Sequence, residues 1–267
     1  MKHVAITGAS SGIGAALVEE YVAAGAQVTM VARRRAEMEA LAARVGGSTQ
    51  IFAMDLSDVS RCCDWLAPAA ARFGPIDILI NNAGVQRVQP AAEHDVADLD
   101  AMLQLNLVAP LRLTQAVLPE MLSRGQGTIV DVSSIAAFAP VRGMWGYVAS
   151  KAGSGFSSEC LGAELEGTGV HVLTVYPGPV YTPLGRDGYA AYPSWAEKLL
   201  VTGDARELAR RIRAAVDLKQ RVLVYPLPYI TSRMFPGITR WFLRTFGPPA
   251  RSRKALNKPP AALPPNG

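Results

Sequence analysis

The sequence predicts an α/β protein in which a single domain is built on a doubly wound parallel sheet. Short apolar runs rich in β-branched residues alternate with helical stretches along most of the 267 residues. The runs are almost continuously apolar, which is typical of parallel strands that are buried on both faces. Hydrophobic residues make up 49% of the chain and charged residues only 18%, so one large core can form.

Seven strands and six helices follow from this alternation. The strands are expected at His3–Thr7, Gln27–Ala32, Gln50–Met54, Ile76–Ile80, Gly127–Val132, Val170–Tyr176 and Arg221–Tyr225. The helices are expected at Gly12–Ala24, Ala36–Val45, Arg61–Phe73, Ala97–Ser123, Tyr147–Gly167 and Asp204–Asp217. Because helices separate the strands, the strands should run parallel and be joined by right-handed crossovers.

Composition divides the chain into a sheet domain over residues 1–226, a segment over residues 227–247 and a tail over residues 248–267. The net charge of +5 comes from the C-terminal end, where nine basic residues and no acidic residue follow Asp217. The high pI is therefore no property of the sheet domain, and it does not predict a nucleic-acid partner. The tail is rich in Pro, Ala, Lys and Arg, and we expect disorder over Arg251–Gly267.

The segment 227–247 has the pattern of an amphipathic basic helix, which Pro236-Gly237 should kink or restart. The apolar side is formed by Ile230, Met234, Ile238, Trp241, Phe242 and Phe246, and the basic side by Arg233, Arg240 and Arg244. Three interpretations stay open: docking on the protein itself or a dimer partner, a cap over a substrate cleft, and a peripheral contact with a membrane surface. We expect the segment to serve the access of hydrophobic substrates rather than catalysis.

Several classes of protein are excluded by what the sequence lacks. No apolar run approaches the ~18 residues of a membrane span, and the N-terminal residues leave no room for a signal peptide. The cysteines and histidines have no spacing that suits a metal ion, and the cysteines are interpreted as reduced thiols. They are Cys62, Cys63, Cys160, His3, His94 and His171. We therefore expect a soluble cytoplasmic protein without a metal site.

A glycine-rich loop, Thr7–Gly14, lies between the first predicted strand and the first predicted helix. Its glycines permit a tight turn and let the backbone approach a pyrophosphate, which the N-terminus of the helix stabilises. A flexible turn is the alternative, but the position at the start of the strand–helix series favours a dinucleotide-binding, Rossmann-type fold. The expected cofactor-binding residues of this loop are Gly8, Ser10, Ser11, Gly12, Ile13 and Gly14.

The second predicted strand ends in Arg33-Arg34-Arg35, and no carboxylate follows until Glu37. An acidic side chain near this strand end binds the ribose 2′-hydroxyl of NAD, whereas an arginine accommodates the 2′-phosphate of NADP. Arg33 and Arg34 therefore favour NADP(H) over NAD(H) as the cofactor. Arg35 is interpreted as a solvated residue that opens the next helix.

Tyr147 and Lys151 lie four residues apart and share one face of a predicted helix. Reduction of a carbonyl needs a proton donor, and oxidation of an alcohol needs a base. A phenol with a pKa near 10 is a poor base at neutral pH, but a nearby positive charge lowers that pKa. Tyrosine and lysine at this spacing are common in helices, so the pair gains its meaning only from other motifs.

Taken in order along the chain, the motifs resemble the short-chain dehydrogenase/reductase family, in the subtype with Thr-Gly-x-x-x-Gly-x-Gly. The matching elements are Thr7–Gly14, Asp55, Asn81-Asn82-Ala83-Gly84, Asn106, Ser133-Ser134, Tyr147-x-x-x-Lys151 and Pro177-Gly178. The resemblance spans about residues 1–185. Their joint occurrence in this order is far more specific than any single motif.

This resemblance implies a role for each matching residue. Tyr147 would be the general acid/base, Ser134 would hydrogen-bond the reacting oxygen, and Lys151 would hold the nicotinamide ribose and tune the tyrosine. Asn106 would position a water in the proton relay. Cofactor contacts are implied for Asp55, Leu56, Asn82, Ala83, Gly84, Tyr147, Lys151, Pro177, Gly178, Val180 and Thr182.

We therefore expect an NADP(H)-dependent oxidoreductase that interconverts a carbonyl and a secondary alcohol. Aromatic and apolar residues near Tyr147 and in the segment Leu184–Leu200 predict a lipophilic substrate, unless they belong to the core or an interface. They are Phe138, Met144, Trp145, Tyr189, Tyr192 and Trp195. The alternative from another class is a cofactor-binding scaffold or sensor without turnover.

The resemblance also implies a homo-oligomer. Many family members end in a strand with Val-Asp-Gly-Gly that helps to build a tetramer. Here Arg221–Pro226 is followed instead by the apolar and basic Leu227–Gly247, so a dimer and a tetramer both stay open.

Overall fold

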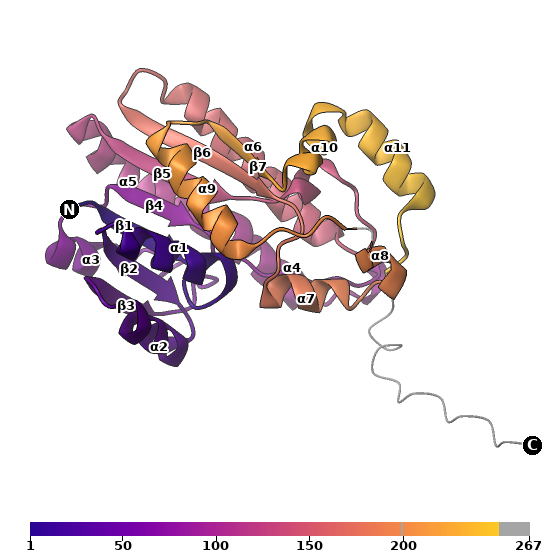
Figure 1. Ribbon diagram of the computed structural model, residues 1–267, viewed down its shortest axis with the longest axis horizontal. Coiled ribbons are helices and arrows are strands. Elements are labelled where there is room, and N and C mark those ends of the chain that lie inside the picture. Colours follow the sequence, from indigo (N-terminus) through magenta and orange to yellow (C-terminus); the bar gives the residue numbers. More distant parts are fainter. Residues whose placement is uncertain (199, 251–267) are drawn as a thin grey trace, which may run out of the picture.

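Seven parallel strands form one sheet in the described part of the chain, in the order β3-β2-β1-β4-β5-β6-β7 (Figure 1). The computed structural model describes residues 1–198 and 200–250, apart from the side chains of Asp187 and Tyr189. The strands are β1 His3–Thr7, β2 Gln27–Ala32, β3 Thr49–Ala53, β4 Ile78–Asn81, β5 Gly127–Val132, β6 Val170–Pro177 and β7 Val222–Tyr225. All seven predicted strands are confirmed, and no bound moves by more than two residues.

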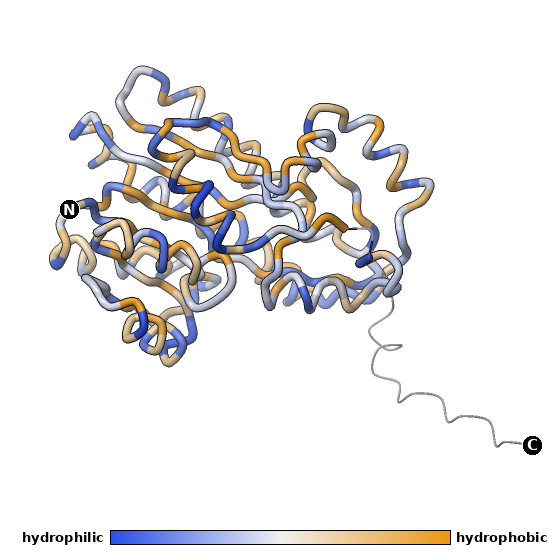
Figure 2. Tube along the Cα trace, viewed as in Figure 1, coloured by the Kyte–Doolittle hydropathy of each residue, from blue (hydrophilic) through white to orange (hydrophobic). Residues whose placement is uncertain are grey.

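Helices cover both faces of this sheet, which confirms the doubly wound architecture. One face carries α1 Gly12–Ala23, α2 Arg35–Val45 and α9 Ala205–Asp217, and the other carries α3 Leu66–Phe73, α5 Ala109–Arg124 and α6 Trp145–Glu164. The core therefore has two apolar layers, with Leu17 and Ile212 fully buried in one and Met121 and Ile129 in the other. Figure 2 shows hydrophobic residues concentrated along the strands between these layers.

Two predicted helices differ from the structure. Residues expected to form one helix over Ala97–Ser123 form α4 Val96–Leu103, a π-helical turn at Gln104–Val108 and then α5. A single π turn leaves the chain helical, so the spacing of apolar residues does not reveal it. The helix predicted from Arg61 begins only at Leu66, because the residues before it form successive turns, in which the amide of Asp64 donates to the carbonyl of Arg61 at 2.9 Å and that of Leu66 to the carbonyl of Cys63 at 3.0 Å.

The strand order reverses between β1 and β4, which lie side by side. Val4 pairs with Val28 on one side and with Ile78 on the other. Segments that leave the carboxyl ends of such neighbouring strands diverge to opposite faces and leave a crevice, where open α/β sheets bind their ligands. The sheet therefore brings the glycine-rich loop and the segment after β4 to one edge.

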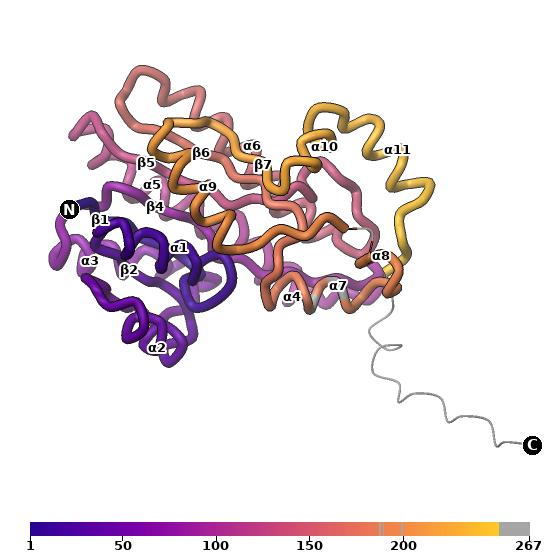
Figure 3. Tube along the Cα trace, viewed as in Figure 1, coloured from indigo at the N-terminus to yellow at the C-terminus, as the bar shows by residue number. Residues whose placement is uncertain are grey.

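Short helices complete the edge of the molecule near this crevice. They are η1 Ala91–Glu93, η3 Ile135–Phe138, α7 Pro183–Tyr189, α8 Ser194–Lys198, η4 Leu227–Tyr229, α10 Ile230–Met234 and α11 Pro236–Phe246. Residues 227–247, which we name the C-terminal arm, project at the end opposite the N-terminus (Figure 3). The predicted break at Pro236-Gly237 is confirmed, since α10 ends at Met234 and α11 begins at Pro236. The predicted disorder of 251–267 lies outside the described residues.

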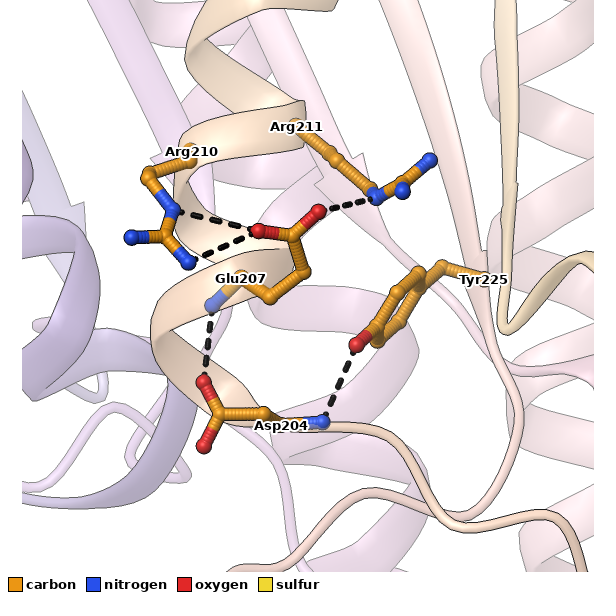
Figure 4. Close-up of polar contacts among 5 residues, drawn as sticks. All are labelled: Asp204, Glu207, Arg210, Arg211 and Tyr225. Atoms are coloured by element: carbon orange, nitrogen blue, oxygen red, sulfur yellow. Dashed lines mark hydrogen bonds and ion pairs between the residues drawn. The ribbon is translucent and has the colours of Figure 1, made fainter.

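Contacts between α9 and the end of β7 fix the point where the arm leaves the sheet (Figure 4). The amide of Asp204 donates to the Tyr225 hydroxyl at 3.0 Å, and the Asp204 carboxylate caps α9 by accepting from the Glu207 amide at 2.9 Å. Glu207 pairs with Arg210 and Arg211, and the Arg211 guanidinium lies 5.4 Å from the centre of the Tyr225 ring. Among the helices of residues 1–198 and 200–250, none is both long and apolar enough to cross a bilayer.

Candidate active site

A cavity of about 1180 Å³ opens beside the carboxyl ends of the strands and reaches the C-terminal arm. Pockets for a single drug-sized ligand usually measure ~300–1,000 Å³, so this cavity is larger than most of them. The predicted site residues that line it are Gly8, Ser10, Ser11, Gly12, Ile13, Arg33, Arg34, Asp55, Leu56, Asn82, Ala83, Gly84, Ser134, Tyr147, Lys151, Pro177, Gly178, Val180 and Thr182. Two other predicted residues, Gly14 and Asn106, lie behind this lining.

The glycine-rich loop is packed so tightly that side chains are excluded at two positions. Gly8 has a φ of +68°, and a Cβ built on it would lie 2.8 Å from the Cα of Ala83. A Cβ on Gly14 would lie 2.2 Å from the carbonyl oxygen of Gly8. The tight turn brings Ser10 and Ser11 to the cavity wall at the N-terminus of α1, where a pyrophosphate is stabilised.

Thr7 joins the ends of β1 and β4, a role that the sequence reasoning missed. Its hydroxyl accepts from the amides of Asn82 at 2.9 Å and Ala83 at 3.0 Å, and donates to the carbonyl of Ile80 at 3.2 Å. The Asn82 side chain returns a hydrogen bond to the carbonyl of Thr7 at 2.9 Å. These bonds hold the loop after β4 against the glycine-rich loop. The threonine at the start of that motif was the available signal.

Arg33 and Arg34 both reach the cavity at the end of β2. Arg34 donates through Nη2 to the hydroxyls of Ser10 at 2.9 Å and Ser11 at 2.6 Å, so it lies across the glycine-rich loop. Arg33 lies 3.6 Å from the carboxylate of Asp55, and both side chains are about half exposed. Burial alone would raise the pKa of Asp55, but hydrogen bonds from Ser57 and the charge of Arg33 hold it below its usual value. Two guanidiniums therefore reach the adenine end expected for a dinucleotide, Arg33 paired with Asp55 and Arg34 lying 3.9 Å from Glu37.

Ser134 and Tyr147 lie together near the middle of the cavity. Ser134 follows β5 and N-caps η3 by accepting from the Ala136 amide at 3.2 Å. Tyr147 is buried in the first turn of α6, and burial raises its pKa, with a hydrogen bond to Ser134 as the opposing effect. The phenol is therefore protonated at neutral pH.

Lys151 is buried one turn further along α6 and contributes to the cavity lining. Its ammonium donates to the carbonyl of Val132 at 2.8 Å. Burial lowers the pKa of Lys151 to about 8, and the nearby carboxylate of Asp131 acts in the opposite direction. A net lowering of the Tyr147 pKa, which the sequence predicts from the nearby charge of Lys151, does not occur in this structure, because burial of the phenol dominates and raises that pKa. The sequence reasoning missed Asp131, although an acid inside an apolar strand run was a visible signal.

Asn106 lies in the π-helical turn and is fully engaged by protein atoms. Its Oδ1 accepts from the Val85 amide at 2.8 Å, and its Nδ2 donates to the Val85 carbonyl at 2.8 Å and to the Ser150 hydroxyl at 3.0 Å. A Cβ on the neighbouring Gly84 would lie 3.2 Å from Asn106 Oδ1 and 3.4 Å from Lys151 Nζ. Asn106 therefore connects the loop after β4 to α6, and its role with a water stays a prediction.

The far end of the cavity is apolar. Its lining includes Val141, Met144, Tyr192, Trp195, Leu200, Tyr229, Phe235, Ile238, Phe242, Leu243 and Phe246. Two predicted pocket aromatics lie elsewhere, because Phe138 packs on Tyr176 and Phe156, and Trp145 packs edge-on against His94. The side chain of Tyr189 lies outside the described residues. The arm was singled out from sequence for its apolar side, and that side contributes to this wall.

Comparison with known proteins agrees with this geometry. The family model for short chain dehydrogenases matches residues 2–192. A D-threitol dehydrogenase from Mycolicibacterium smegmatis is 40% identical over 206 residues, which cover 76% of this chain and 79% of that relative. A fatty acyl-CoA reductase from Mycobacterium tuberculosis is 38% identical over 192 residues, which cover 68% of this chain but only 64% of that relative.

A solved structure supports the same assignment over the whole length. A short-chain dehydrogenase from Sphingobium yanoikuyae in complex with NADPH superposes with a TM-score of 0.79 at 27% identity, and the match covers 100% of both chains. The fold and the site define an oxidoreductase that binds a nicotinamide dinucleotide. The chain belongs to the short chain dehydrogenase family.

The residues present fit such a cofactor. The glycine-rich loop provides a side-chain-free cradle beside the N-terminus of α1, and Ser10, Ser11 and Gly12 would hold the pyrophosphate. Asp55 and Leu56 would border the adenine end. Lys151 would reach the nicotinamide ribose, next to the space that Gly84 leaves free.

Replacement of Tyr147 by Phe should lower turnover by about 10²–10⁴-fold and leave the NADPH dissociation constant nearly unchanged. The ring still packs, but the proton donor is lost. The matched control is Tyr229→Phe, which removes another cavity-lining phenol from the arm and should retain activity. Steady-state kinetics and fluorescence titration measure both quantities. Substantial activity in Tyr147→Phe would assign the acid to another group.

The pH dependence of carbonyl reduction should report Lys151. The pKa of Lys151 is lowered to about 8, so its charge is present below that pH and lost above it. The raised pKa of Tyr147 keeps the phenol protonated through this range. We expect kcat/KM to fall as the pH rises through about 8. In Lys151→Arg the fall should move to higher pH, because a guanidinium stays protonated. An unmoved profile in this variant would contradict the assignment.

Proposed function

We propose that the protein interconverts a carbonyl group and a secondary alcohol with NADP(H), and that its substrate is lipophilic. One observation carries this proposal. A single cavity brings Ser134 and Tyr147 between a dinucleotide-type glycine loop and an apolar wall. The catalytic groups therefore stand where a cofactor and an apolar substrate would meet.

The side chains have complementary tasks in this reaction. When bound, the nicotinamide supplies a hydride to the carbonyl carbon or accepts it from the alcohol. Ser134 and Tyr147 would both donate hydrogen bonds to the carbonyl oxygen and stabilise the negative charge that develops there. The protonated phenol of Tyr147 would then transfer its proton to the alkoxide. Lys151 would stabilise the resulting phenolate through its charge and hold the ribose.

The choice of NADP(H) is supported by the charges at the end of β2. Arg33 and Arg34 line the cavity, and the carboxylate at the end of β3, Asp55, is already paired with Arg33. A 2′-phosphate at this position would gain charge-assisted hydrogen bonds from two guanidiniums. The solved relative from Sphingobium yanoikuyae, which is bound to NADPH, is consistent with this choice.

The lipophilic substrate is supported by the wall opposite the glycine-rich loop. Aromatic and aliphatic side chains from α8 and the arm form most of the cavity wall there, together with the polar side chains of Glu197, Thr231, Ser232 and Thr239. Apolar surface removed from water contributes about 25 cal/mol per Å², so a long apolar substrate would gain affinity along this wall. The fatty acyl-CoA reductase among the relatives supports the same class.

A scaffold or sensor without turnover is the second candidate. A scaffold or sensor needs only the residues that bind the cofactor. It does not need a protonated phenol beside a serine hydroxyl. Assays of a panel of lipophilic and small ketones, followed by NADPH absorbance, decide between the two. Turnover of any ketone excludes the scaffold.

Replacement of Arg33 by Ala should weaken NADPH binding about ten- to a hundredfold and change NADH binding little, because only NADPH carries the 2′-phosphate. Arg35→Ala is the matched control. Arg35 pairs with Glu39 at 3.5 Å outside the cavity lining, so its loss should affect neither cofactor. Titrations with both cofactors measure the effect. If Arg33→Ala weakened the binding of NADPH and NADH equally, the result would contradict the choice of NADP(H) and favour NAD(H) as the cofactor.

Two of the predicted partners, a membrane surface and a second copy of the chain, would bind to the exposed surface of the arm. Trp241 is 62% exposed, and Arg240 and Arg244 are exposed beside it on α11. Basic and aromatic residues on one helix suit an anionic lipid surface. We expect the protein to float with phosphatidylserine-containing liposomes at low salt, and Arg240→Glu with Arg244→Glu to abolish this. Flotation that is unchanged in the double variant would contradict the membrane contact, and light scattering would then test the homo-oligomer as the occupant of this surface.

A further inference from the structure

We propose that Arg142 determines substrate specificity by clamping α11 over the far end of the cavity, so that long apolar carbonyl compounds are selected. This inference rests on the proposed function. Arg142 lies five residues before Tyr147 in the segment 139–144, which contributes Ala139, Val141 and Met144 to the cavity wall. Its guanidinium, however, points to the arm.

Helix α11 has little packing to hold it in place. None of its residues is buried, although Phe242, Leu243 and Phe246 line the cavity. Phe242 and Phe246 stay 53% and 57% exposed, and they contact each other with ring centres 5.3 Å apart. A helix without buried residues gains little stability from tertiary contacts. Specific polar bonds must therefore contribute much to its position.

The C-terminal end of α11 receives such bonds from Arg142. Nη2 donates to the carbonyl of Arg244 at 2.8 Å, and Nη1 donates to the carbonyl of Gly247 at 3.0 Å. The last carbonyls of a helix have no donor within the helix, and a cation is favourable at this end. One side chain thus satisfies two acceptors at the end of α11.

The backbone around Arg142 connects this clamp to two other segments, one of which lines the cavity. The carbonyl of Arg142 accepts from the Tyr192 hydroxyl at 2.7 Å, and Tyr192 belongs to the segment that precedes α8. The carbonyl of Gly143 accepts from the Gln89 amide at 3.0 Å. Arg142 therefore lies where the segment before Tyr147, the segment before α8 and the arm meet.

The other end of the arm is held independently. In α10, Arg233 pairs with both oxygens of Glu159 on α6, with Nη2 at 2.8 Å from Oε2. Its guanidinium also lies 5.6 Å from the centre of the Phe138 ring and 5.3 Å from that of Tyr176. Loss of Arg142 should therefore release only the far end of α11 and leave the rest of the arm attached.

This arrangement predicts a selective effect on substrates. A short ketone needs only the hydrogen bonds of Ser134 and Tyr147. A long apolar ketone extends along Phe242 and its neighbours, where each buried methylene contributes about fourfold to affinity. A displaced α11 would expose that part of the chain to water.

The test uses Arg142→Ala with two substrates, a long-chain methyl ketone and butanone. We expect the KM of the long ketone to rise about tenfold with little change in kcat, and both constants of butanone to stay unchanged. Phe242→Ala should reproduce this pattern. Trp241→Ala is the matched control, because Trp241 is an aromatic residue of the same helix that does not line the cavity.

Calorimetric binding of the long ketone to the protein loaded with NADP tests the clamp without turnover, with about tenfold weaker binding expected for Arg142→Ala. If neither ketone is reduced by the wild-type protein, the proposed function fails, and the binding experiment still decides on the clamp. Equal changes for both ketones, or no change for either, would overturn the clamp. Should Arg142→Ala lose its thermal transition, the comparison of Phe242→Ala with Trp241→Ala decides whether α11 selects the long ketone.

Discussion

The ends of β1 and β4 approach so closely that the backbone itself forms the contact. The Thr7 hydroxyl bonds three backbone groups at the end of β4 and just after it, and the Asn82 amide returns to Thr7. Gly8 tolerates this approach because a side chain there would collide with Ala83. The same contact sets the path of the glycine-rich loop and that of the loop carrying Gly84. The two halves of the proposed cofactor site therefore depend on one junction, and the proposed catalytic groups are placed relative to it.

The residues with proposed catalytic roles are connected to this junction through a second polar layer. Asn106 holds Val85 and bonds Ser150 on α6, and the Ser133 hydroxyl donates to the carbonyl of Lys151 at 2.6 Å. Asp131 lies buried between Asn81, which donates to it at 2.9 Å, and α6. Buried polar groups are costly unless they are hydrogen-bonded, so this layer tolerates few alternative arrangements. This layer of hydrogen bonds fixes the rotation of α6 about its axis and thereby determines the direction in which Tyr147 and Lys151 point.

The sequence predicted what is encoded locally. Apolar runs set the seven strands, and glycine spacing set the loop at the end of β1. Most residues implied by the family resemblance do line the cavity. Contacts between distant segments could not be predicted from the sequence. Nothing in the residues around Arg142 indicates that its hydrogen-bond partners lie about a hundred residues later. The sequence predicted a lowered pKa for Tyr147, but burial raises it. Burial depends on the tertiary structure, which the spacing of residues in the sequence does not show.

The two ends of the cavity differ in how tightly their backbone is packed and hydrogen-bonded. At the cofactor end, close backbone contacts at Gly8 and Gly14 and the hydrogen bonds of Thr7 hold the loops in place. At the arm, α11 has no buried residue and is held by the Glu159–Arg233 pair at one end and by the hydrogen bonds of Arg142 at the other. The groups that form these bonds are exposed or partly buried. Bonds to exposed groups contribute less than buried ones because water competes for them. The arm can therefore change in sequence or position at small cost to folding. In the proposed reaction, substrate selection would thus be separated from hydride and proton transfer, and one catalytic centre could serve different apolar substrates.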